Sequence, residues 1–260
     1  MTRIDVPELE DQSFCPPLLR DALTDVLRIS STVFRLFEGA IPIIRDTLSA
    51  TKAERIVDLC SGAGGPLLSL LAPLERHHGL RIPVVLTDKF PNKRAFARAE
   101  AEHPGQVHAR HVPTDATAVP NELTGMRTIF NALHHFPPHL ARAIFADAAK
   151  RRQPIASFEI LERTPATGIL IATLPPVVMA MTPFIRPMTV ARFGMTYVVP
   201  VIPAAVWWDG FASALRVYSH KELEELVEGL GDESYRFRIE RSRMPWLPFH
   251  MTTVVGMPVS

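Results

Sequence analysis

The stretch Arg55-Ile-Val-Asp-Leu-Cys-Ser-Gly-Ala-Gly-Gly-Pro66 decides the fold of this chain. Its first four residues are typical of the end of a buried strand, and the apolar run from Pro66 is typical of a helix start. The small residues between them predict a tight turn that lets a ligand approach the backbone, with free N–H groups at the helix start pointing at it. The stretch therefore indicates a nucleotide-binding turn, although many α/β proteins carry glycines here simply to make the turn.

The composition fits one large domain, or one domain with a sizeable insertion. The chain has 260 residues, and its 28 Lys and Arg nearly balance its 27 Asp and Glu. No global field favours nucleic acid, so we expect no nucleic-acid partner. The two cysteines, Cys15 and Cys60, lack CxxC spacing, which argues against a disulfide framework or a zinc site. The histidines form no spaced ligand set, so no metal ligand is predicted.

The first residues indicate where in the cell the protein is located and how well the N-terminal segment is ordered. Met1 to Gln12 carry acids and no apolar core, so no signal peptide is expected. With the cysteine usage, this favours a cytoplasmic protein. The polar segment from Met1 to Ser13 is expected to be loosely held.

Strand and helix patterns alternate along the rest of the chain. Two apolar helices are expected at 16–29 and 32–49, before the first strand. The expected strands cover residues 55–58, 81–88, 107–112, 127–131 and 155–160, and two more are expected at 235–241 and 250–257. Helices are expected at 91–100, 139–150 and from Ser219, where Glu222 completes a capping box. The alternation predicts an α/β fold with a doubly wound, mainly parallel sheet.

Polar residues fall where the expected strands end. Ligands of such sheets bind at the carboxyl ends of the strands. The residues at these ends are Asp58, Asp88, Asp115, Asn131 and Glu159. Asp88 has a second interpretation, because it could also cap the following helix. Five polar residues around one rim nevertheless indicate a site.

This pattern resembles the class I S-adenosylmethionine-dependent methyltransferases. In that family the first strand ends in an acid, which a Gly-x-Gly-x-Gly turn follows. Gly62 and Gly64 match the second and third glycines, while Cys60 replaces the first. Nicotinamide binding fits less well, because Leu67 would stand at the third glycine of Gly-x-Gly-x-x-Gly.

The resemblance implies a cofactor and its binding residues. S-adenosylmethionine would be bound by Asp58, Cys60, Ser61, Gly62, Gly64, Asp88, Lys89, Asp115, Ala116, Asn131 and Ala132. Among these, Asp58 and the Ser61–Gly62 backbone would hold the methionine moiety, and Asp88 the ribose hydroxyls. Asp115 and Ala116 would face the adenine, and Asn131 and Ala132 would lie beside the sulfonium. The resemblance also implies a seven-stranded Rossmann-like sheet that ends in an antiparallel pair.

The expected organisation has four parts. Residues 1–50 form an N-terminal helical cap, and 51–163 the cofactor-binding core. Residues 164–210 form an apolar helical insertion after the fifth strand. Residues 211–260 supply a helix and the strand pair that complete the core.

The insertion allows three interpretations. Neither Thr164–Ile185 nor Phe193–Trp208 contains a charged residue, but Pro175 and Pro176 would break a membrane-spanning helix. The segment could be a buried subdomain over the cofactor, a lid over an apolar acceptor, or a surface that contacts a membrane through 164–208. Trp207 and Trp208 suit a pocket wall or a headgroup-level anchor.

Methyl transfer to a hydroxyl or an acidic carbon requires a base. His134 and His135 follow the fourth expected strand, and Glu159 ends the fifth, so these are the candidate catalytic residues. Alternatively, one histidine is buried against the sheet and the other caps a backbone carbonyl, while Glu159 forms a salt bridge or a helix cap. Glu162 and Asp209 are weaker candidates. No Gly-x-Ser-x-Gly elbow or cysteine nucleophile context indicates a hydrolase.

The leading hypothesis is methyl transfer from S-adenosylmethionine to a small hydrophobic acceptor, by a cytoplasmic protein with possible membrane association. One alternative keeps the cofactor but changes the reaction, for example to amino transfer onto a quinone. Another is a non-catalytic partner that binds the cofactor or a lipid.

Overall fold

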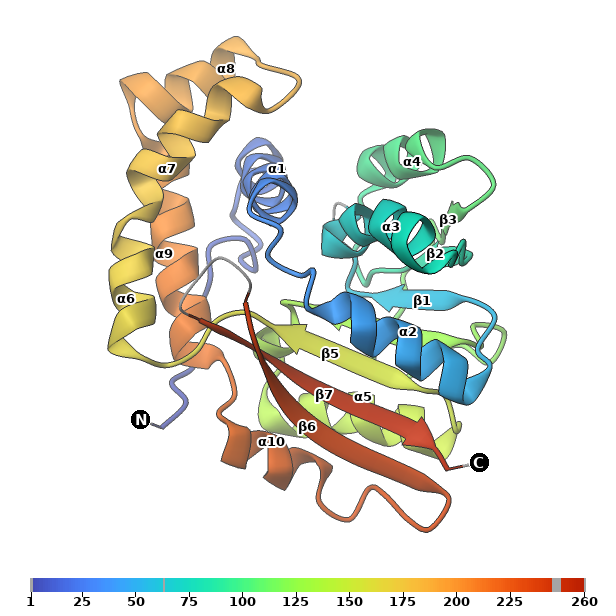
Figure 1. Cartoon of the computed structure of the whole chain (residues 1–260). Coiled ribbons are helices and arrows are strands. Elements are labelled where there is room, and N and C mark those ends of the chain that lie inside the picture. Colours follow the sequence, from blue (N-terminus) through green and yellow to red (C-terminus); the bar gives the residue numbers. More distant parts are fainter. Residues whose placement is uncertain (1, 63, 245–248, 260) are drawn as a thin grey trace.

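Seven strands form one sheet in the computed structural model of this chain, which describes residues 2–62, 64–244 and 249–259 (Figure 1). Their order is β3-β2-β1-β4-β5-β7-β6, and β7 runs antiparallel to both β5 and β6, while the other neighbouring pairs are parallel. The strands are β1 (Ile56–Leu59), β2 (Val84–Leu86), β3 (Val107–Ala109), β4 (Met126–Phe130), β5 (Ile155–Glu159), β6 (Tyr235–Arg243) and β7 (His250–Pro258). The predicted seven-stranded sheet with a terminal antiparallel pair is confirmed.

The central strands β1, β4 and β5 are buried at every position. Helices cover both faces of the sheet, so side chains of these strands are buried on either side. On one face lie α2 (Ala40–Thr51), α3 (Gly65–His78) and α4 (Lys93–Glu102), and on the other α5 (Pro138–Lys150) and α10 (His220–Val227). Polar side chains inside these strands include Arg127 and Thr128, which pair with Asp147 and Asp58, and Ser157, whose Oγ has no partner within the described residues.

Local sequence signals account for the helix ends. Gly64, with φ 95°, precedes α3, and Pro66 occupies its first turn. Gly79, with φ 64°, ends α3 in the left-handed conformation that glycine favours. The predicted capping box of Ser219 and Glu222 begins α10.

Four local predictions are wrong. The second helix does not begin at Thr32: α1 (Pro17–Val33) continues to that point, turns follow in which Arg35 has φ 52°, and α2 begins at Ala40. Strand β2 begins only after Pro83, which has no N–H to donate, and β3 is shorter than predicted. The cap of α4 is Asn92, whose side chain accepts from the Ala95 N–H, and not Asp88.

The apolar insertion folds as a helical layer beside the carboxyl end of β5 (Figure 1). Its elements are α6 (Pro165–Ala172), α7 (Leu174–Met181), a 3₁₀ turn (Thr182–Phe184), α8 (Val190–Phe193), a π-helical turn (Gly194–Val198) and α9 (Val201–Arg216). Pro175 and Pro176 lie in the first turn of α7, so the predicted break at these prolines is confirmed. Helix α1 contacts both α9 and α3, and its apolar face packs against Val178, Ile202 and Ala205.

Within the described ranges, no single helix is both long and apolar enough to cross a membrane. Two bent helix pairs meet that criterion on length and composition alone. They are Pro165–Ala172 with Leu174–Phe184, and Val190–Val198 with Val201–Arg216.

A buried ion pair between Arg127 of β4 and Asp147 of α5 links this helix to the sheet. Arg127 is 0% exposed, and its Nη1 donates to Oδ2 of Asp147 over 2.7 Å. Asp147→Ala leaves a buried guanidinium without its carboxylate, so we expect a loss of about 3–5 kcal/mol in unfolding free energy. Urea denaturation measures this loss.

The matched control is Asp46→Ala, which removes the exposed pair with Arg45. It should cost less than about 1 kcal/mol. Equal losses in the two variants would contradict the assigned role of the Arg127 pair.

Candidate active site

Asp58 lies on β1, beside Thr128 of β4. Its Oδ1 accepts a hydrogen bond of 2.6 Å from the Thr128 hydroxyl, and the side chain is buried. Burial raises the pKa of Asp58 to about 7, although the Thr128 hydrogen bond opposes the shift. The carboxyl group is thus poised near neutrality at the start of the glycine turn.

The glycine turn is held open by backbone conformation. Cys60, Gly62 and Gly64 all have positive φ values, of 58°, 53° and 95°. Cys60 therefore adopts the left-handed conformation usual for glycine, at a cost of about 1–2 kcal/mol. A Cβ added at Gly62 would meet no atom within 4 Å, so the space over the turn is open.

Asp88 connects this turn to the second strand. Its Oδ2 accepts from the Gly62 N–H over 2.8 Å, and its Oδ1 accepts from the Phe90 N–H over 2.8 Å. Each carboxylate oxygen can accept a further hydrogen bond. The backbone thus fixes the Asp88 carboxylate and leaves it able to bind a ligand hydroxyl.

The next strand end brings Asp115 beside Asp88. The Thr114 N–H donates to the Asp88 carbonyl, and Lys89 Nζ lies 3.4 Å from Oδ2 of Asp115. Hydrogen bonds from Thr117 lower the pKa of Asp115. Ala116 is buried in the apolar cluster on the α5 side of the sheet, and Ala132 packs against that cluster.

Asn131 follows β4 in a left-handed conformation, with φ 50°. Its N–H donates to the Phe158 carbonyl. Its Oδ1 is buried and has no hydrogen-bond partner among residues 2–62, 64–244 and 249–259. Such a group is costly unless something binds it, which marks Asn131 as a contact point for a ligand.

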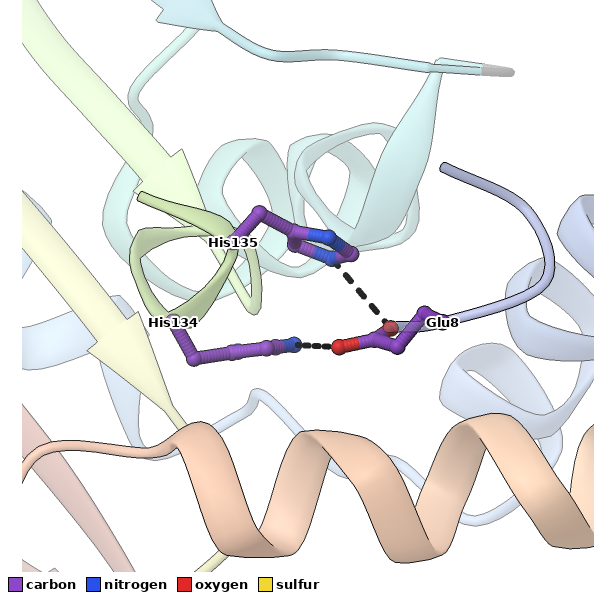
Figure 2. Close-up of side chains that lie close together, drawn as sticks. All are labelled: Glu8, His134 and His135. Atoms are coloured by element: carbon purple, nitrogen blue, oxygen red, sulfur yellow. Dashed lines mark ion pairs between the residues drawn. The ribbon is translucent and has the colours of Figure 1, made fainter. Parts of the chain in front are cut away.

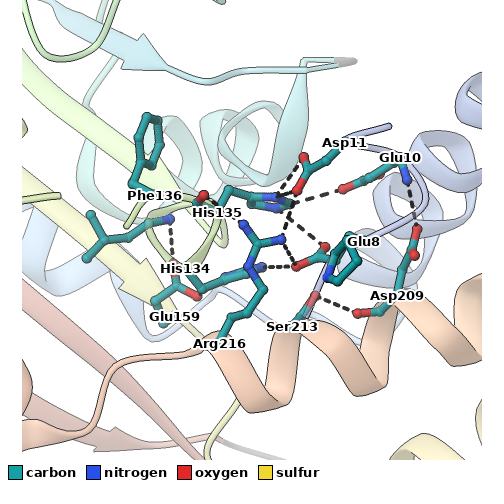
Figure 3. A network of polar contacts seen from close by, with 12 residues as sticks. Glu8, Glu10, Asp11, His134, His135, Phe136, Glu159, Asp209, Ser213 and Arg216 are labelled. Atoms are coloured by element: carbon teal, nitrogen blue, oxygen red, sulfur yellow. Dashed lines mark hydrogen bonds and ion pairs between the residues drawn. The ribbon is translucent and has the colours of Figure 1, made fainter. Parts of the chain in front are cut away.

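His134 and Glu159 form a buried pair on the same rim (Figure 3). Nδ1 of His134 lies 2.7 Å from Oε2 of Glu159, and Oε1 of Glu159 accepts from the Leu133 N–H. Because a carboxylate can only accept, the ring proton lies on Nδ1. In the neutral ring, Nε2 then carries the lone pair.

The expectation that residues 1–13 are loosely held is wrong for the part the structure describes. Arg216 of α9 contacts Oε1 of Glu8 at 3.1 Å and Oδ2 of Asp11 at 2.8 Å, and Nη2 donates to the His135 carbonyl (Figure 3). Arg3 donates to the His134 and Phe136 carbonyls. These partners are remote in sequence, so the segment's polar composition did not reveal these contacts.

His135 pairs with a carboxylate and does not cap a backbone carbonyl. Its Nδ1 lies 3.1 Å from both carboxylate oxygens of Asp11. Burial lowers the pKa of His135, but the Asp11 hydrogen bond and the charges of Glu8, Asp11 and Glu10 outweigh it and raise the pKa to about 9. Burial raises the pKa of Glu10 to about 7 and that of Asp209 to about 6.

A cavity of about 340 Å³ opens beside these groups. Its walls are mostly apolar side chains of α1, α6, α7 and α9, including Leu23, Val26, Leu170, Leu174 and Val177. Its polar end is formed by Glu8, Glu10, Asn131, His134, His135 and Asp209. The insertion therefore encloses a pocket of the size and character that suits a small apolar molecule.

The structure groups the predicted site residues into two neighbouring sets. Asp58, the glycine turn, Asp88, Lys89 and Asp115 line the rim of β1 and β2. His134 and His135 lie at the polar end of the cavity, Glu159 contacts Nδ1 of His134 from behind, and Asn131 lies between the two sets. Asp209 also reaches the cavity, whereas Glu162 pairs with Arg241 outside it.

Several residues of this region were missed by sequence reasoning. Glu8, Glu10, Asp11 and Arg216 come from segments without a motif. Phe90, directly after the Asp88–Lys89 pair, is 83% exposed. An apolar residue beside a predicted ligand-binding acid was the only signal available.

Comparisons with solved structures agree with the topology. The citrinin polyketide synthase CMeT domain aligns with a TM-score of 0.56 at 13% identity, over 96% of this chain and 59% of that one. The methyltransferase domain of bacterial CtHen1 aligns with a TM-score of 0.50 at 11% identity, over 86% of this chain and 100% of that one. No protein-family model and no curated protein matches the sequence. The chain thus has the class I methyltransferase fold.

Asp58 predicts a pH dependence of stability. The pKa of Asp58 is about 7 in the folded chain and 3.8 for the free side chain, which stands for the unfolded chain. The folded chain therefore binds this proton more tightly than the unfolded chain does. The stabilisation is present below about pH 4 and is lost as the pH rises through 7. Relative to Asp58→Asn, the wild type should lose about 2 kcal/mol of unfolding free energy between about pH 5.5 and 8.

Urea denaturation of both proteins across this range measures the difference. Parallel curves of unfolding free energy against pH for the two proteins would show that folding does not raise the pKa of Asp58.

Proposed function

We propose that this chain transfers a methyl group from S-adenosylmethionine to a small apolar acceptor with one polar reacting group. The observation that carries the proposal is the double role of Asn131. It ends the strand beside β1 at the ligand-binding rim, and it also lines the apolar cavity. A donor on the rim and an acceptor in the cavity would thus meet at one residue.

The rim residues fit the cofactor. Gly62 has open space above it, and the unpartnered Oδ1 of Asn131 can accept from a ligand donor. The fixed Asp88 carboxylate has free lone pairs for ribose hydroxyls. The exposed ring of Phe90 offers a face on which a purine can stack, and such stacking contributes about 1–3 kcal/mol.

The cavity fits the acceptor. Its apolar walls exclude water and hold the acceptor's body, so the reacting group is directed to the polar end. The bound cofactor supplies an activated methyl group on its sulfonium. The chain must therefore position the acceptor and help remove its proton if the acceptor is a hydroxyl or an acidic carbon.

His134 is placed for this second task. Glu159 holds the ring proton on Nδ1 and fixes the ring, and the Nε2 side faces the cavity end near Glu8. The lone pair on Nε2 is the group that activates the acceptor. His135, which is paired with Asp11, Glu8 and Glu10, lies against His134 with ring centroids 4.4 Å apart.

Cofactor binding is tested by calorimetric titration with S-adenosylhomocysteine. We expect saturable binding, and Asp88→Ala should weaken it about 10- to 100-fold through the loss of charge-assisted hydrogen bonds. Phe90→Ala, which removes no rim hydrogen bond, should weaken it about tenfold. Asp46→Ala, on the exposed face of α2, is the control and should bind as the wild type does.

Failure of the folded wild type to bind S-adenosylhomocysteine would overturn the proposed function. Normal binding by both the Asp88 and Phe90 variants would place the cofactor elsewhere.

The acceptor cavity is tested with an apolar phenol. We expect 2-naphthol to bind the wild type, as followed by its fluorescence, and Val177→Trp to weaken binding at least tenfold by filling the cavity. Val190→Trp makes the same change at a side chain that is 90% exposed and outside the cavity, so its binding should be unchanged.

Affinity for S-adenosylhomocysteine should be the same in both tryptophan variants. Equal 2-naphthol binding by both variants would show that the probe occupies another place.

A further inference from the structure

We propose that Glu8, His134 and His135 form a binding site for one divalent transition-metal ion. The site lies at the polar end of the apolar cavity, and Figure 2 shows both imidazole rings turned toward the Glu8 carboxylate. One ligand comes from the N-terminal segment and two from the short helix after β4, Leu133–His135. Two imidazoles and a carboxylate form a donor set suited to zinc and to other late divalent metals.

The distances between the three groups suit an ion more than direct hydrogen bonds. Oε1 of Glu8 lies 3.7 Å from Nε2 of His134, and Oε2 lies 3.7 Å from Nε2 of His135. These separations exceed the usual hydrogen-bond limit of about 3.2 Å. Ligand atoms on a tetrahedral ion with bonds of about 2.1 Å are about 3.4 Å apart, so small side-chain shifts would complete the site.

His134 provides an independent indication of a ligand. Its side chain is 1% exposed, yet Nε2 has no hydrogen-bond partner within the described part of the chain. The lone pair of this nitrogen faces Glu8, whose side chain is also almost fully buried. A buried nitrogen in this state is costly unless something binds it.

Both histidines are oriented as metal ligands are. Nδ1 of His134 contacts the Glu159 carboxylate at 2.7 Å, and Nδ1 of His135 contacts the Asp11 carboxylate at 3.1 Å. Metal-binding histidines commonly donate the second ring N–H to a carboxylate, which fixes the tautomer and orients the ring. Both histidines have this arrangement, and the Nε2 atom of each lies 3.7 Å from an oxygen of the Glu8 carboxylate.

The charge around the site also favours a cation. The carboxylates of Glu8, Asp11 and Glu159 contact the histidines directly, and Glu10 lies 3.8 Å from Nε2 of His135. Arg216 is the cation that pairs with Glu8 and Asp11. Once the ion replaces the Nε2 proton of His135, the four carboxylates of this group exceed its one guanidinium, and the divalent charge offsets that excess.

The ion's role rests on the proposed function, although the site itself does not. With the ion bound, the Nε2 lone pair of His134 is a ligand and no longer acts as the base, so the ion takes over the activation of the acceptor. An acceptor hydroxyl bound to the ion would lose its proton more easily, because metal coordination lowers the pKa of bound oxygen. The released proton passes to water. The oxygen then forms a bond to the methyl carbon, and the electrons of the broken carbon–sulfur bond remain on sulfur, giving S-adenosylhomocysteine.

Metal titration of the chelator-treated full-length protein tests the site. We expect calorimetry to show one equivalent of Zn²⁺, and Glu8→Gln to weaken binding at least 100-fold. Glu224→Gln is the matched control, because Glu224 also lies beside a histidine, His220, but on the exposed surface of α10. It should leave the affinity unchanged.

Co²⁺ gives a readout that a merely structural pair would not produce. Bound to the wild type, it should give visible ligand-field absorption, and this should be lost on addition of Zn²⁺. Glu159→Gln, which alters only the carboxylate behind His134, should weaken Co²⁺ binding about 10- to 100-fold. If Glu8→Gln does not fold, Co²⁺ binding by the wild type and by Glu159→Gln tests the metal site instead.

No Co²⁺ spectrum from the folded wild type, or equal Zn²⁺ affinity in the wild type and Glu8→Gln, would overturn the metal site. These titrations contain no S-adenosylmethionine, so their outcome is independent of the cofactor experiment. Cofactor binding without metal binding would leave His134 as a general base and the proposed methyl transfer intact.

Discussion

The burial of the central parallel strands on both faces is the constraint on which the rest of the structure depends. Because β1, β4 and β5 are covered by helices, polar groups that must remain available to a ligand are placed at the strand ends. Asp58, Asn131 and Glu159 occupy those ends. The sheet thus brings together residues that are about a hundred positions apart, and the helices hold them in a dry surrounding where each hydrogen bond counts for more.

The second organising interaction is the tie between the N-terminal segment and α9. Arg216 contacts Glu8 and Asp11 and also the His135 carbonyl, so a single guanidinium joins three distant segments. This tie places Glu8 opposite the two histidines and closes the cavity at its polar end. Glu8 and Glu10 of the segment therefore line the cavity, and Asp11 pairs with His135 beside it.

Helix α1 packs against the apolar insertion and forms the opposite wall of the cavity. Residues such as Leu23 and Val26 on α1 face Val178 and Leu174 on α7, and the space left between them is the cavity. This arrangement accounts for the apolar side chains that face inward, since these meet other helices or the cavity. It does not account for those that remain exposed, such as Ile169 on α6, Val190 on α8 and Trp207 on α9.

The sequence by itself determined the sheet, its order of elements and the polar residues at the strand ends. These depend on local signals: the glycine turn after Asp58, buried apolar strands, and acids where strands end. It also indicated His134, His135 and Glu159 as neighbours at one rim. Only the tertiary structure decided what those side chains meet. Glu8, Asp11 and Arg216 carry no motif, and their pairing depends on how α9 and residues 2–13 pack over the sheet. Contacts between residues more than a hundred positions apart have no local sequence signal, because side-chain packing, and not backbone propensity, selects them.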